Sequence, residues 1–319
     1  MKNRSLVLLS GEKTSIPEAE AKALFLAYDA EATFSSPEER LLVVESSVDP
    51  VRVSRRVAFA RRVGLLLSSP SEAFETVRNR RVRYQSFHIG DGPVQETAVS
   101  KLLEGLEATV DLENPDFEFS NVVGRKEYFM LSTPGQMRQA WARRRPRKRP
   151  FFHPSAIFPK LSRALVNLTR CREGDTFLDP LAGTGSLPIE ANEVGLFPLA
   201  IDRSKRMACG ALANMKAFGQ PWPDVIRADA FQPPVVRVDG IATDVPYGRA
   251  SSTGGRSPGA VIDLVMRKFP ELLKPGGRLV VMHPSQVPLE ARGGTKVEGE
   301  HYIYIHKKLT RAITILRKT

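Results

Sequence analysis

The second half of the sequence predicts an α/β fold with a largely parallel sheet, and the first half predicts a mixed α+β region. From residue 153 onward, short apolar runs alternate with longer segments of helical spacing, as in a parallel α/β sheet. Aspartates follow four of the expected strands, and open α/β sheets bind their ligands along that edge. We therefore expect a ligand site at the carboxyl ends of these strands.

Apolar runs and helical spacing define the elements of the second half. We expect strands at 177–178, 199–201, 225–226, 240–243, 278–281, 302–305 and 312–315. We expect helices at 161–168, from residue 186, at 207–218 and at 260–273. The last helix should stop at Lys274-Pro275-Gly276-Gly277, which cannot easily continue it.

The first half mixes strands and helices and shows no internal repeat. The apolar runs 6–9, 41–44 and 128–131 predict strands. Val53, Val57 and Ala60 recur at helical spacing between arginines, and residues 98–106 have a second helical face.

A basic run with prolines around it separates the two halves. Pro134-Gly135 and Pro146 do not easily continue regular structure. We therefore predict an N-terminal region at 1–135, a basic linker at 136–152 and a C-terminal domain at 153–319.

The chain has 319 residues and a formal net charge of +12, which favours a polyanionic partner. The densest basic run supplies our candidate phosphate contacts. They are Arg143, Arg144, Arg145, Arg147, Lys148 and Arg149. A solvated helix face explains any single basic cluster equally well.

Cysteine content and hydropathy indicate the compartment. The two cysteines, Cys171 and Cys209, form no CxxC pair, so neither a disulfide framework nor a metal site is predicted. No apolar run approaches the roughly 20 residues needed to span a bilayer. We expect a cytoplasmic protein with no membrane partner, and we favour a monomer.

The turn after the first strand of the C-terminal domain carries the cofactor signal. It reads Asp179-Pro180-Leu181-Ala182-Gly183-Thr184-Gly185, and its glycines let the backbone approach a ligand closely. A GxG alone is weak, because glycines also make strand-to-helix turns without a ligand. The third glycine of a dinucleotide fingerprint is absent, and an acid would crowd a pyrophosphate. A carboxylate is better suited to S-adenosylmethionine, which carries a sulfonium and an ammonium group.

Two further aspartates end the next two strands. Asp202 stands where a carboxylate can accept hydrogen bonds from both ribose hydroxyls, or where it can cap the following helix. Asp229 stands where it can bind an adenine amino group, or where it is a plain loop carboxylate. Three acids at successive strand ends, with Asp179 as the first, favour the cofactor interpretation.

The sequence Asp244-Val245-Pro246-Tyr247 follows the fourth strand and contains the candidate catalytic groups. An exocyclic amine on a base is a poor nucleophile, because its lone pair is delocalised into the ring. The Asp244 carboxylate and the Val245 carbonyl can each accept one N–H bond, which directs the lone pair at a methyl group. Pro246 stiffens the turn, and the Tyr247 ring can stack on the base.

An ordinary Asp-x-Pro turn is the alternative interpretation. Its place on the same sheet edge as the glycine turn disfavours that alternative. The glycine- and serine-rich stretch 248–256 follows directly, and it is either a candidate lid or a disordered connection.

These motifs resemble those of class I methyltransferases, and specifically the archaeal and eukaryotic family that makes N2-methylguanosine at position ten of tRNA. The resemblance extends over nearly the whole chain. It is carried by His153 to Leu168, by the turns at 179–185 and 244–248, and by the tail 306–311. Upstream, His88-Ile89-Gly90 and the stretch 110–116 resemble a THUMP domain, an RNA-binding module of tRNA-modifying enzymes.

The resemblance implies a Rossmann-like, seven-stranded methyltransferase domain preceded by a ferredoxin-like lobe and a THUMP domain. It implies S-adenosylmethionine as cofactor, tRNA as partner, and N2-methylguanosine with N2,N2-dimethylguanosine as products. It also places Pro159 at the methionine end of the cofactor. The family's usual motif is Asp-Pro-Pro-Tyr, and this chain has Val245 in place of the first proline. Valine keeps the backbone carbonyl but loses rigidity.

Two other classes of function stay open from the sequence. One is an amino-methyltransferase that acts on another tRNA guanine, on rRNA or on adenine in DNA, although the THUMP-like half argues against DNA. The other is a non-catalytic RNA-binding protein with a vestigial cofactor fold, against which the intact set of Asp179, Asp202 and Asp244 argues.

Overall fold

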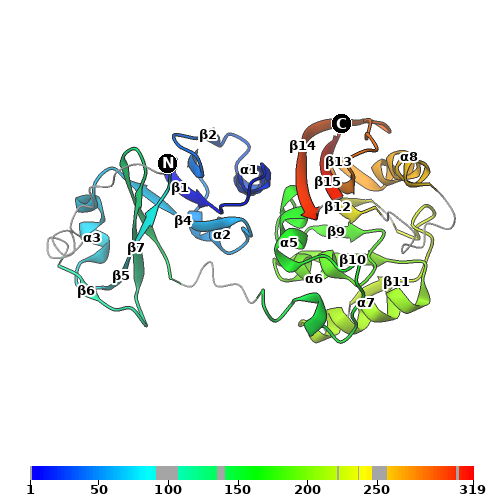
Figure 1. The fold of residues 1–319 in the computed structure, drawn as a ribbon, viewed down its shortest axis with the longest axis horizontal. Coiled ribbons are helices and arrows are strands. Elements are labelled where there is room, and N and C mark those ends of the chain that lie inside the picture. The colour runs from blue at the N-terminus through cyan, green and yellow to red at the C-terminus, as the bar shows by residue number, and fades with distance from the viewer. Residues whose placement is uncertain are drawn as a thin grey trace. The chain divides into compact units, whose positions relative to one another are not determined.

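A computed structural model describes residues 2–90, 107–134, 141–220, 223–235, 237–245, 257–306 and 309–319. The chain divides into two compact units, each built on one sheet (Figure 1). The first comprises Met1–Lys13 and Leu24–Gln139, and the second comprises Thr14–Ala23 and Ala140–Thr319. The structure describes residues 141–152 of the predicted linker, and these residues belong to the second unit.

The first unit contains an eight-stranded sheet in the order β2-β3-β1-β4-β8-β7-β5-β6. Its strands are β1 (Asn3–Leu9), β2 (Thr33–Ser35), β3 (Leu41–Ser46), β4 (Ala60–Leu67), β5 (Arg81–His88), β6 (Thr109–Val110), β7 (Phe117–Val123) and β8 (Glu127–Ser132). The helices of the first half of the chain are α1 (Ile16–Tyr28), α2 (Pro50–Ser54), α3 (Phe74–Val77) and the 3₁₀ helix η1 (Pro70–Ala73). Strand β5 runs parallel to β6 and β7, and the other pairs are antiparallel.

The strands predicted at 6–9, 41–44 and 128–131 are confirmed by β1, β3 and β8. The helix predicted through Val53, Val57 and Ala60 is wrong beyond Ser54. Helix α2 ends there, and Ala60 begins β4, which pairs with β1. Pairing with a distant strand therefore prevails over local helical spacing. The helix predicted at 98–106 lies outside the described residues.

The second unit contains a seven-stranded sheet in the order β11-β10-β9-β12-β13-β15-β14. Its strands are β9 (Thr176–Asp179), β10 (Phe197–Ile201), β11 (Asp224–Ile226), β12 (Val238–Asp244), β13 (Leu273–Pro284), β14 (Thr295–His306) and β15 (Leu309–Lys318). Strands β9 to β13 are mutually parallel, and β15 runs antiparallel between β13 and β14. The seven strands predicted for this half are all present.

Helices connect the parallel strands of this sheet, as Figure 1 shows. The connecting helices are α6 (Ser186–Asn192), α7 (Lys205–Ala217), α8 (Pro258–Lys268) and the 3₁₀ helix η3 (Phe269–Leu272), and α5 (Pro159–Leu168) precedes β9. Local chemistry explains where they begin. Ser204 and Ser257 cap α7 and α8 by accepting backbone N–H bonds, and Pro159 occupies the first turn of α5.

The core of the second unit lies between its central strands and α8. Leu178, Ile241 and Leu279 are fully buried there, and Val265 and Phe269 pack against the same cluster. Burying one such side chain contributes about 1.5–3 kcal/mol. This packing fixes the strand ends, and therefore the residues that follow them.

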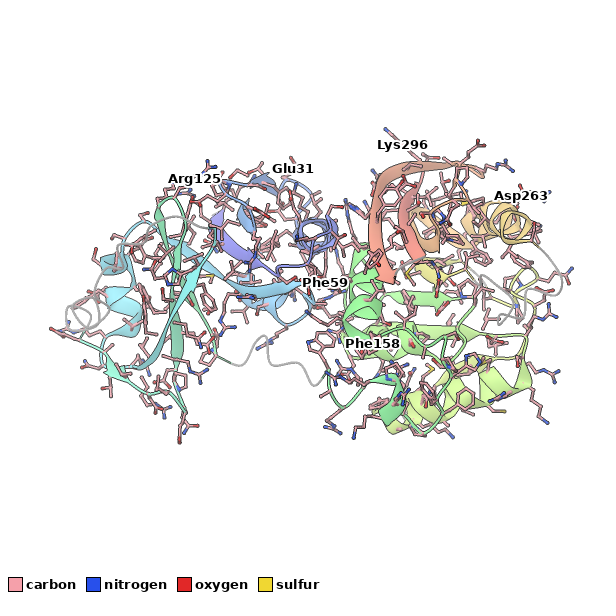
Figure 2. The ribbon with its side chains drawn as sticks, viewed as in Figure 1. Glu31, Phe59, Arg125, Phe158, Asp263 and Lys296 are labelled. Atoms are coloured by element: carbon pink, nitrogen blue, oxygen red, sulfur yellow. The ribbon has the colours of Figure 1, made fainter. Side chains whose placement is uncertain are left out.

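Charged side chains such as Glu31, Arg125 and Lys296 lie on the exterior of their units (Figure 2). Each helix in the described part of the chain falls short of the length and apolar character that crossing a bilayer requires.

Candidate active site

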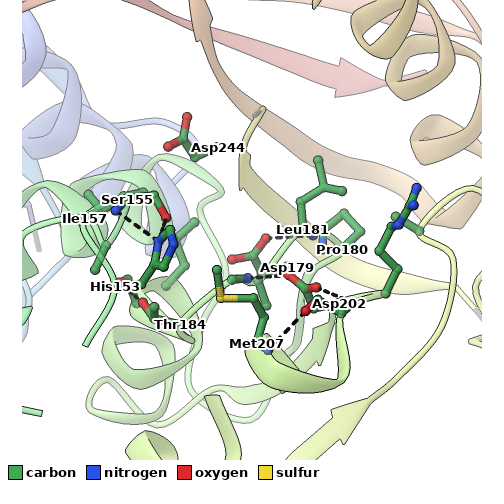
Figure 3. A pocket seen from close by; sticks show the side chains of 18 of the residues that line it. His153, Ser155, Ile157, Asp179, Pro180, Leu181, Thr184, Asp202, Met207 and Asp244 are labelled. Carbon is green, nitrogen blue, oxygen red and sulfur yellow. Dashed lines mark hydrogen bonds between the residues drawn. The ribbon is translucent and has the colours of Figure 1, made fainter. Parts of the chain in front are cut away.

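A cavity of about 500 Å³ opens at the carboxyl ends of β9, β10 and β12. Figure 3 shows the aspartates at the ends of these strands around it. Its lining consists of His153, Pro154, Ser155, Ala156, Ile157, Asp179, Pro180, Leu181, Ala182, Gly183, Thr184, Ser186, Leu187, Asp202, Arg203, Ser204, Met207, Asp229, Ala230, Phe231, Asp244 and Val261. The four aspartates that the sequence selected therefore meet in one cavity.

Asp179 is buried at the end of β9. Its Oδ1 accepts hydrogen bonds from the Thr243 hydroxyl at 2.9 Å and from the Leu181 backbone N–H at 3.2 Å. Burial raises the pKa of Asp179 to about 7, and the hydrogen bonds oppose that rise only in part. The carboxyl group can therefore be neutral or charged near neutral pH.

The glycine turn places the backbone of Gly183 against the cavity. Gly183 has a φ of +52°, and a Cβ added there would have no neighbour within 4 Å. Gly185 has a φ of +77°, and a Cβ added there would lie 3.3 Å from the Cβ of Ala211. Gly183 thus faces the cavity, whereas Gly185 allows the turn and the close approach of α7.

Asp202 follows β10 and holds the glycine turn. Its Oδ2 accepts the N–H of Gly183 at 3.0 Å, and its Oδ1 accepts the N–H of Ser204 at 2.8 Å. Burial raises the pKa of Asp202. The side-chain cap of α7 is Ser204, so Asp202 is not the helix cap that the sequence offered as an alternative. Each of its oxygens retains capacity for a second hydrogen bond.

Asp229 lines the cavity in the turn after β11. Its Oδ1 accepts the N–H of Phe231 at 3.0 Å. Phe231 also lines the cavity, and its ring stacks on Phe269 with a centroid separation of 5.9 Å. Phe231 was not among the site residues predicted from the sequence, although its position two residues after Asp229 could have indicated it.

Asp244 ends β12, and burial raises its pKa to about 6. Its Oδ1 accepts a hydrogen bond from Nη2 of Arg311, a buried residue of β15. The same nitrogen lies 3.3 Å from the carbonyl oxygen of Val245. Arg311 is thus a site residue whose role was not predicted from the sequence. Only the strand order of the sheet brings it to Asp244.

Val245 is fully buried in the core of the second unit. Its N–H donates to the carbonyl of Met282 at 2.8 Å, a bond that a proline could not make. This hydrogen bond ties Val245 to β13.

The other predicted cofactor and catalytic residues are Pro159, which the structure describes, and Pro246 and Tyr247, which it does not. Pro159 begins α5 and does not line the cavity, although the preceding segment 153–157 does. Pro246, Tyr247 and the candidate lid 248–256 lie outside the described residues.

The six basic residues of the run at 143–149 separate into two groups. Arg144 and Arg149 are only 4% and 5% exposed. Arg144 forms ion pairs with Glu190 at 2.7 Å and Glu193 at 2.9 Å. Arg149 donates to the Ser186 hydroxyl at 2.6 Å, and burial lowers its pKa to about 10. The phosphate contacts predicted for these two arginines are corrected: their guanidinium groups bind protein.

Four members of the run remain exposed. These are Arg143, Arg145, Arg147 and Lys148. The candidate phosphate contacts are therefore limited to this exposed set.

The chemistry of the cavity fits S-adenosylmethionine. Among its described lining residues are four aspartates and one arginine, so the cavity favours a cation. Leu181, Phe231 and Val261 supply apolar surface for an adenine ring. The open backbone at Gly183 allows the close approach of a ligand.

Comparison with known proteins supports this interpretation. The family described as RMKL-like, methyltransferase domain, matches residues 146–311. A tRNA (guanine(10)-N2)-dimethyltransferase of Methanocaldococcus jannaschii is 35% identical over 222 residues, which cover 66% of this chain and 60% of that protein. The protein of the same name from Methanothermobacter thermautotrophicus is 26% identical over 332 residues, which cover 98% of this chain and 99% of that protein.

Among solved structures, the crystal structure of TrmN from Thermus thermophilus matches with a TM-score of 0.52 and 18% identity. The match covers 99% of this chain and 100% of that one.

The seven-stranded sheet with its reversed strand, and the acidic cavity at its carboxyl edge, define a class I methyltransferase that uses S-adenosylmethionine. The matched segment covers more than half of the chain. The protein belongs to the RMKL-like methyltransferase family.

Proposed function

We propose that this protein transfers methyl groups from S-adenosylmethionine to the exocyclic N2 amine of guanosine at position ten of tRNA. The names of the two relatives described above support this substrate, and they favour two successive transfers. One relative is covered over only 60% of its length, whereas the other is covered over 99%.

The observation that carries the proposal is the pair of acceptors at the end of β12. The Asp244 carboxylate lines the cavity, and the carbonyl of the adjacent Val245 belongs to the same turn. Two acceptors that bind the two N–H groups of an amine concentrate its lone pair on the face opposite them. Asp244 also lies in the same cavity as Asp179 and Asp202, so an amine held by it is near the cofactor.

The remaining residues have separate tasks in this proposal. S-adenosylmethionine supplies the methyl group when it is bound. Asp202 binds the ribose hydroxyls, Asp229 binds the adenine amino group, and Asp179 faces the cationic end. Pro246 and Tyr247 are proposed to stiffen the turn and to stack on the guanine.

The substrate base must leave its stack to reach Asp244, and extrusion of a base costs a few kcal/mol. We propose that the N-terminal half, with its THUMP-like sequence, and the exposed basic residues at 143–148 grip the tRNA backbone and offset that cost. Such contacts read shape and phosphates rather than sequence.

Mass spectrometry of nucleosides tests the proposal. Unmodified tRNA treated with the purified protein and S-adenosylmethionine should contain N2-methylguanosine and N2,N2-dimethylguanosine at position ten. Asp244→Asn should abolish both products, because the NH2 group of the amide is a donor and repels the N–H groups of the target amine. The variant should retain cofactor affinity. Methylation of another position, of rRNA alone, or of no RNA would refute the assignment.

A further inference from the structure

We propose that Arg311 is a positioning residue for methyl transfer, which holds the Asp244 carboxylate and the Val245 carbonyl in the arrangement that the target amine requires. This inference rests on the proposed function, because the amine is the group that these two acceptors would bind.

The geometry places one buried cation against Asp244 and the carbonyl group of Val245. Arg311 is 1% exposed and lies near the start of β15, where it pairs in register with Pro284 of β13. Its Nη2 contacts Asp244 Oδ1 and lies 3.3 Å from the Val245 oxygen and 3.1 Å from the Met282 oxygen. The side chain therefore reaches across β13 and joins the ends of three strands.

The contacts of Arg311 do not use every acceptor position of Asp244 and Val245. A guanidinium nitrogen of this kind carries two protons, and it faces three acceptor oxygens here. Asp244 Oδ1 accepts from Arg311, while Oδ2 has no hydrogen-bond partner among the described residues. Each carbonyl oxygen has two lone pairs. We assign the second carboxylate oxygen of Asp244 and the second lone pair of the Val245 oxygen to the two N–H groups.

The charge of Arg311 matters as much as its position. A carboxyl group must be ionised to act only as an acceptor, and burial opposes ionisation of Asp244 by raising its pKa to about 6. The charge of Arg311 and its hydrogen bond both lower the pKa of Asp244 and so favour the ionised carboxylate. Without Arg311, a larger fraction of Asp244 would be protonated at neutral pH.

Other titratable groups surround this pair. Asp179 of β9 interacts with Asp244, and its negative charge would disfavour ionisation of Asp244. His283 of β13 interacts electrostatically with Glu300 of β14 and with Arg311. Burial lowers the pKa of His283, which keeps its imidazole neutral. Arg311 is the one group among these that favours the Asp244 carboxylate.

A purely structural role is the competing explanation, since a buried carboxylate needs a partner in any protein. The two explanations differ in what a substitution changes. A structural role lowers stability alone, whereas a positioning role changes the pH dependence of transfer and the pKa of Asp244 in folded protein.

The test compares Arg311→Met, Arg311→Lys and the control Arg317→Met in the full-length protein. Arg317 lies on the same strand but is exposed at its opposite end. Single-turnover methyl transfer to tRNA is followed across about pH 5 to 9. Carbon-13 NMR of labelled aspartate, assigned with Asp244→Asn, measures the Asp244 pKa without any substrate, and calorimetry measures S-adenosylmethionine affinity.

Arg311→Met should raise the Asp244 pKa and the acidic limb of the rate profile together by about 1–3 pH units. Its rate at high pH should fall roughly 10- to 100-fold, because the two acceptors lose their fixed geometry. Arg311→Lys should keep the acidic limb near that of the wild type but still lower the rate, because an ammonium group cannot replace the planar fork. Arg317→Met should change neither quantity.

Three results would overturn the inference. The first is an Arg311→Met variant with the wild-type pH profile. The second is an Arg311→Met variant that is slower but has an unchanged Asp244 pKa. The third applies if Arg311→Met does not fold, and it is an Arg311→Lys variant with the wild-type rate. A wild-type protein that methylates no tRNA guanosine would instead refute the proposed function, and the two failures are therefore distinguishable.

Discussion

Thr243 donates its hydroxyl proton to the Asp179 carboxylate over 2.9 Å, and this bond connects β12 to the end of β9. Both groups are buried. Burial raises the pKa of Asp179, and the charge of Asp244, the residue after Thr243, raises it further. The cofactor side and the catalytic side of the cavity are therefore joined by one hydrogen bond and coupled by the repulsion of two carboxylates.

S-adenosylmethionine affinity should increase as the pH rises through the pKa of Asp179, which is about 7. The neutral carboxyl group that dominates below this value attracts a cation weakly, so binding must release a proton there. Affinity should fall up to about tenfold for each pH unit below the pKa. Calorimetry in two buffers of different ionisation enthalpy measures both the affinity and the released proton.

Asp179→Asn is the control for this pH dependence. It should bind S-adenosylmethionine more weakly than the wild type at high pH, and its affinity should hardly vary between pH values. A wild-type dissociation constant that stays level through neutral pH would show that Asp179 does not face the cationic end of the cofactor.

Asp202→Ala should weaken S-adenosylmethionine binding by roughly 1–3 kcal/mol, the cost of leaving buried polar groups unpaired. The substitution removes a proposed partner of the ribose and also frees the N–H of Gly183, which Asp202 holds at 3.0 Å. Calorimetry measures the loss. Asp224→Ala, which changes an exposed carboxylate of the adjacent β11, is the matched control. Equal affinities in the two variants would remove Asp202 from the cofactor site.

The strand pattern of the second unit could be predicted because it depends on local information. Each strand is marked by a short apolar run, and the aspartates that line the cavity end those strands or follow them within three residues. The partnership of Arg311 with Asp244 could not be predicted in this way. It depends on β15 pairing with β13, which is a property of the sheet and not of either segment.

The basic run shows a second limit of prediction from sequence. Its composition is typical of a solvated surface, yet Arg144 and Arg149 turn inward between exposed neighbours. A 3₁₀ turn, η2 (Pro146–Lys148), interrupts the segment, so no regular period marks the buried members. Glu190, the acidic partner of Arg144, and Ser186, the partner of Arg149, are both on α6, far along the chain.

Arg144→Met should destabilise the second unit by about 3–5 kcal/mol, because it removes one partner of a buried carboxylate. Glu190 is fully buried, and Arg163 at 2.8 Å would be its remaining arginine partner among the described residues. Both tryptophans of the chain belong to this unit, so their fluorescence during urea denaturation reports its unfolding. Arg143→Met, an exposed neighbour, should change stability by less than about 0.5 kcal/mol. Similar midpoints for the two variants would show that the ion pairs contribute little.

Replacing the four exposed basic residues of the run, Arg143, Arg145, Arg147 and Lys148, with alanine should weaken tRNA binding and leave the second unit folded. Each lost phosphate contact should reduce the slope of log affinity against log salt by about 0.7–0.9. Arg144 and Arg149 must be kept, because Arg144 pairs with buried Glu190 and Arg149 binds Ser186. Their loss would confuse instability with weak binding.

Cofactor affinity should not change in this fourfold variant, because none of the four residues lines the cavity. Lys296→Ala with Arg317→Ala is the charge control, since both residues are exposed but lie where β14 begins and β15 ends, at the opposite edge of the sheet from Asp244. Filter binding over a series of salt concentrations measures the slopes. The fourfold variant could keep the wild-type salt slope, or the control could lose as much slope as the fourfold variant. Either result would show that the exposed part of the run is a solvated linker and that tRNA binds elsewhere on the protein.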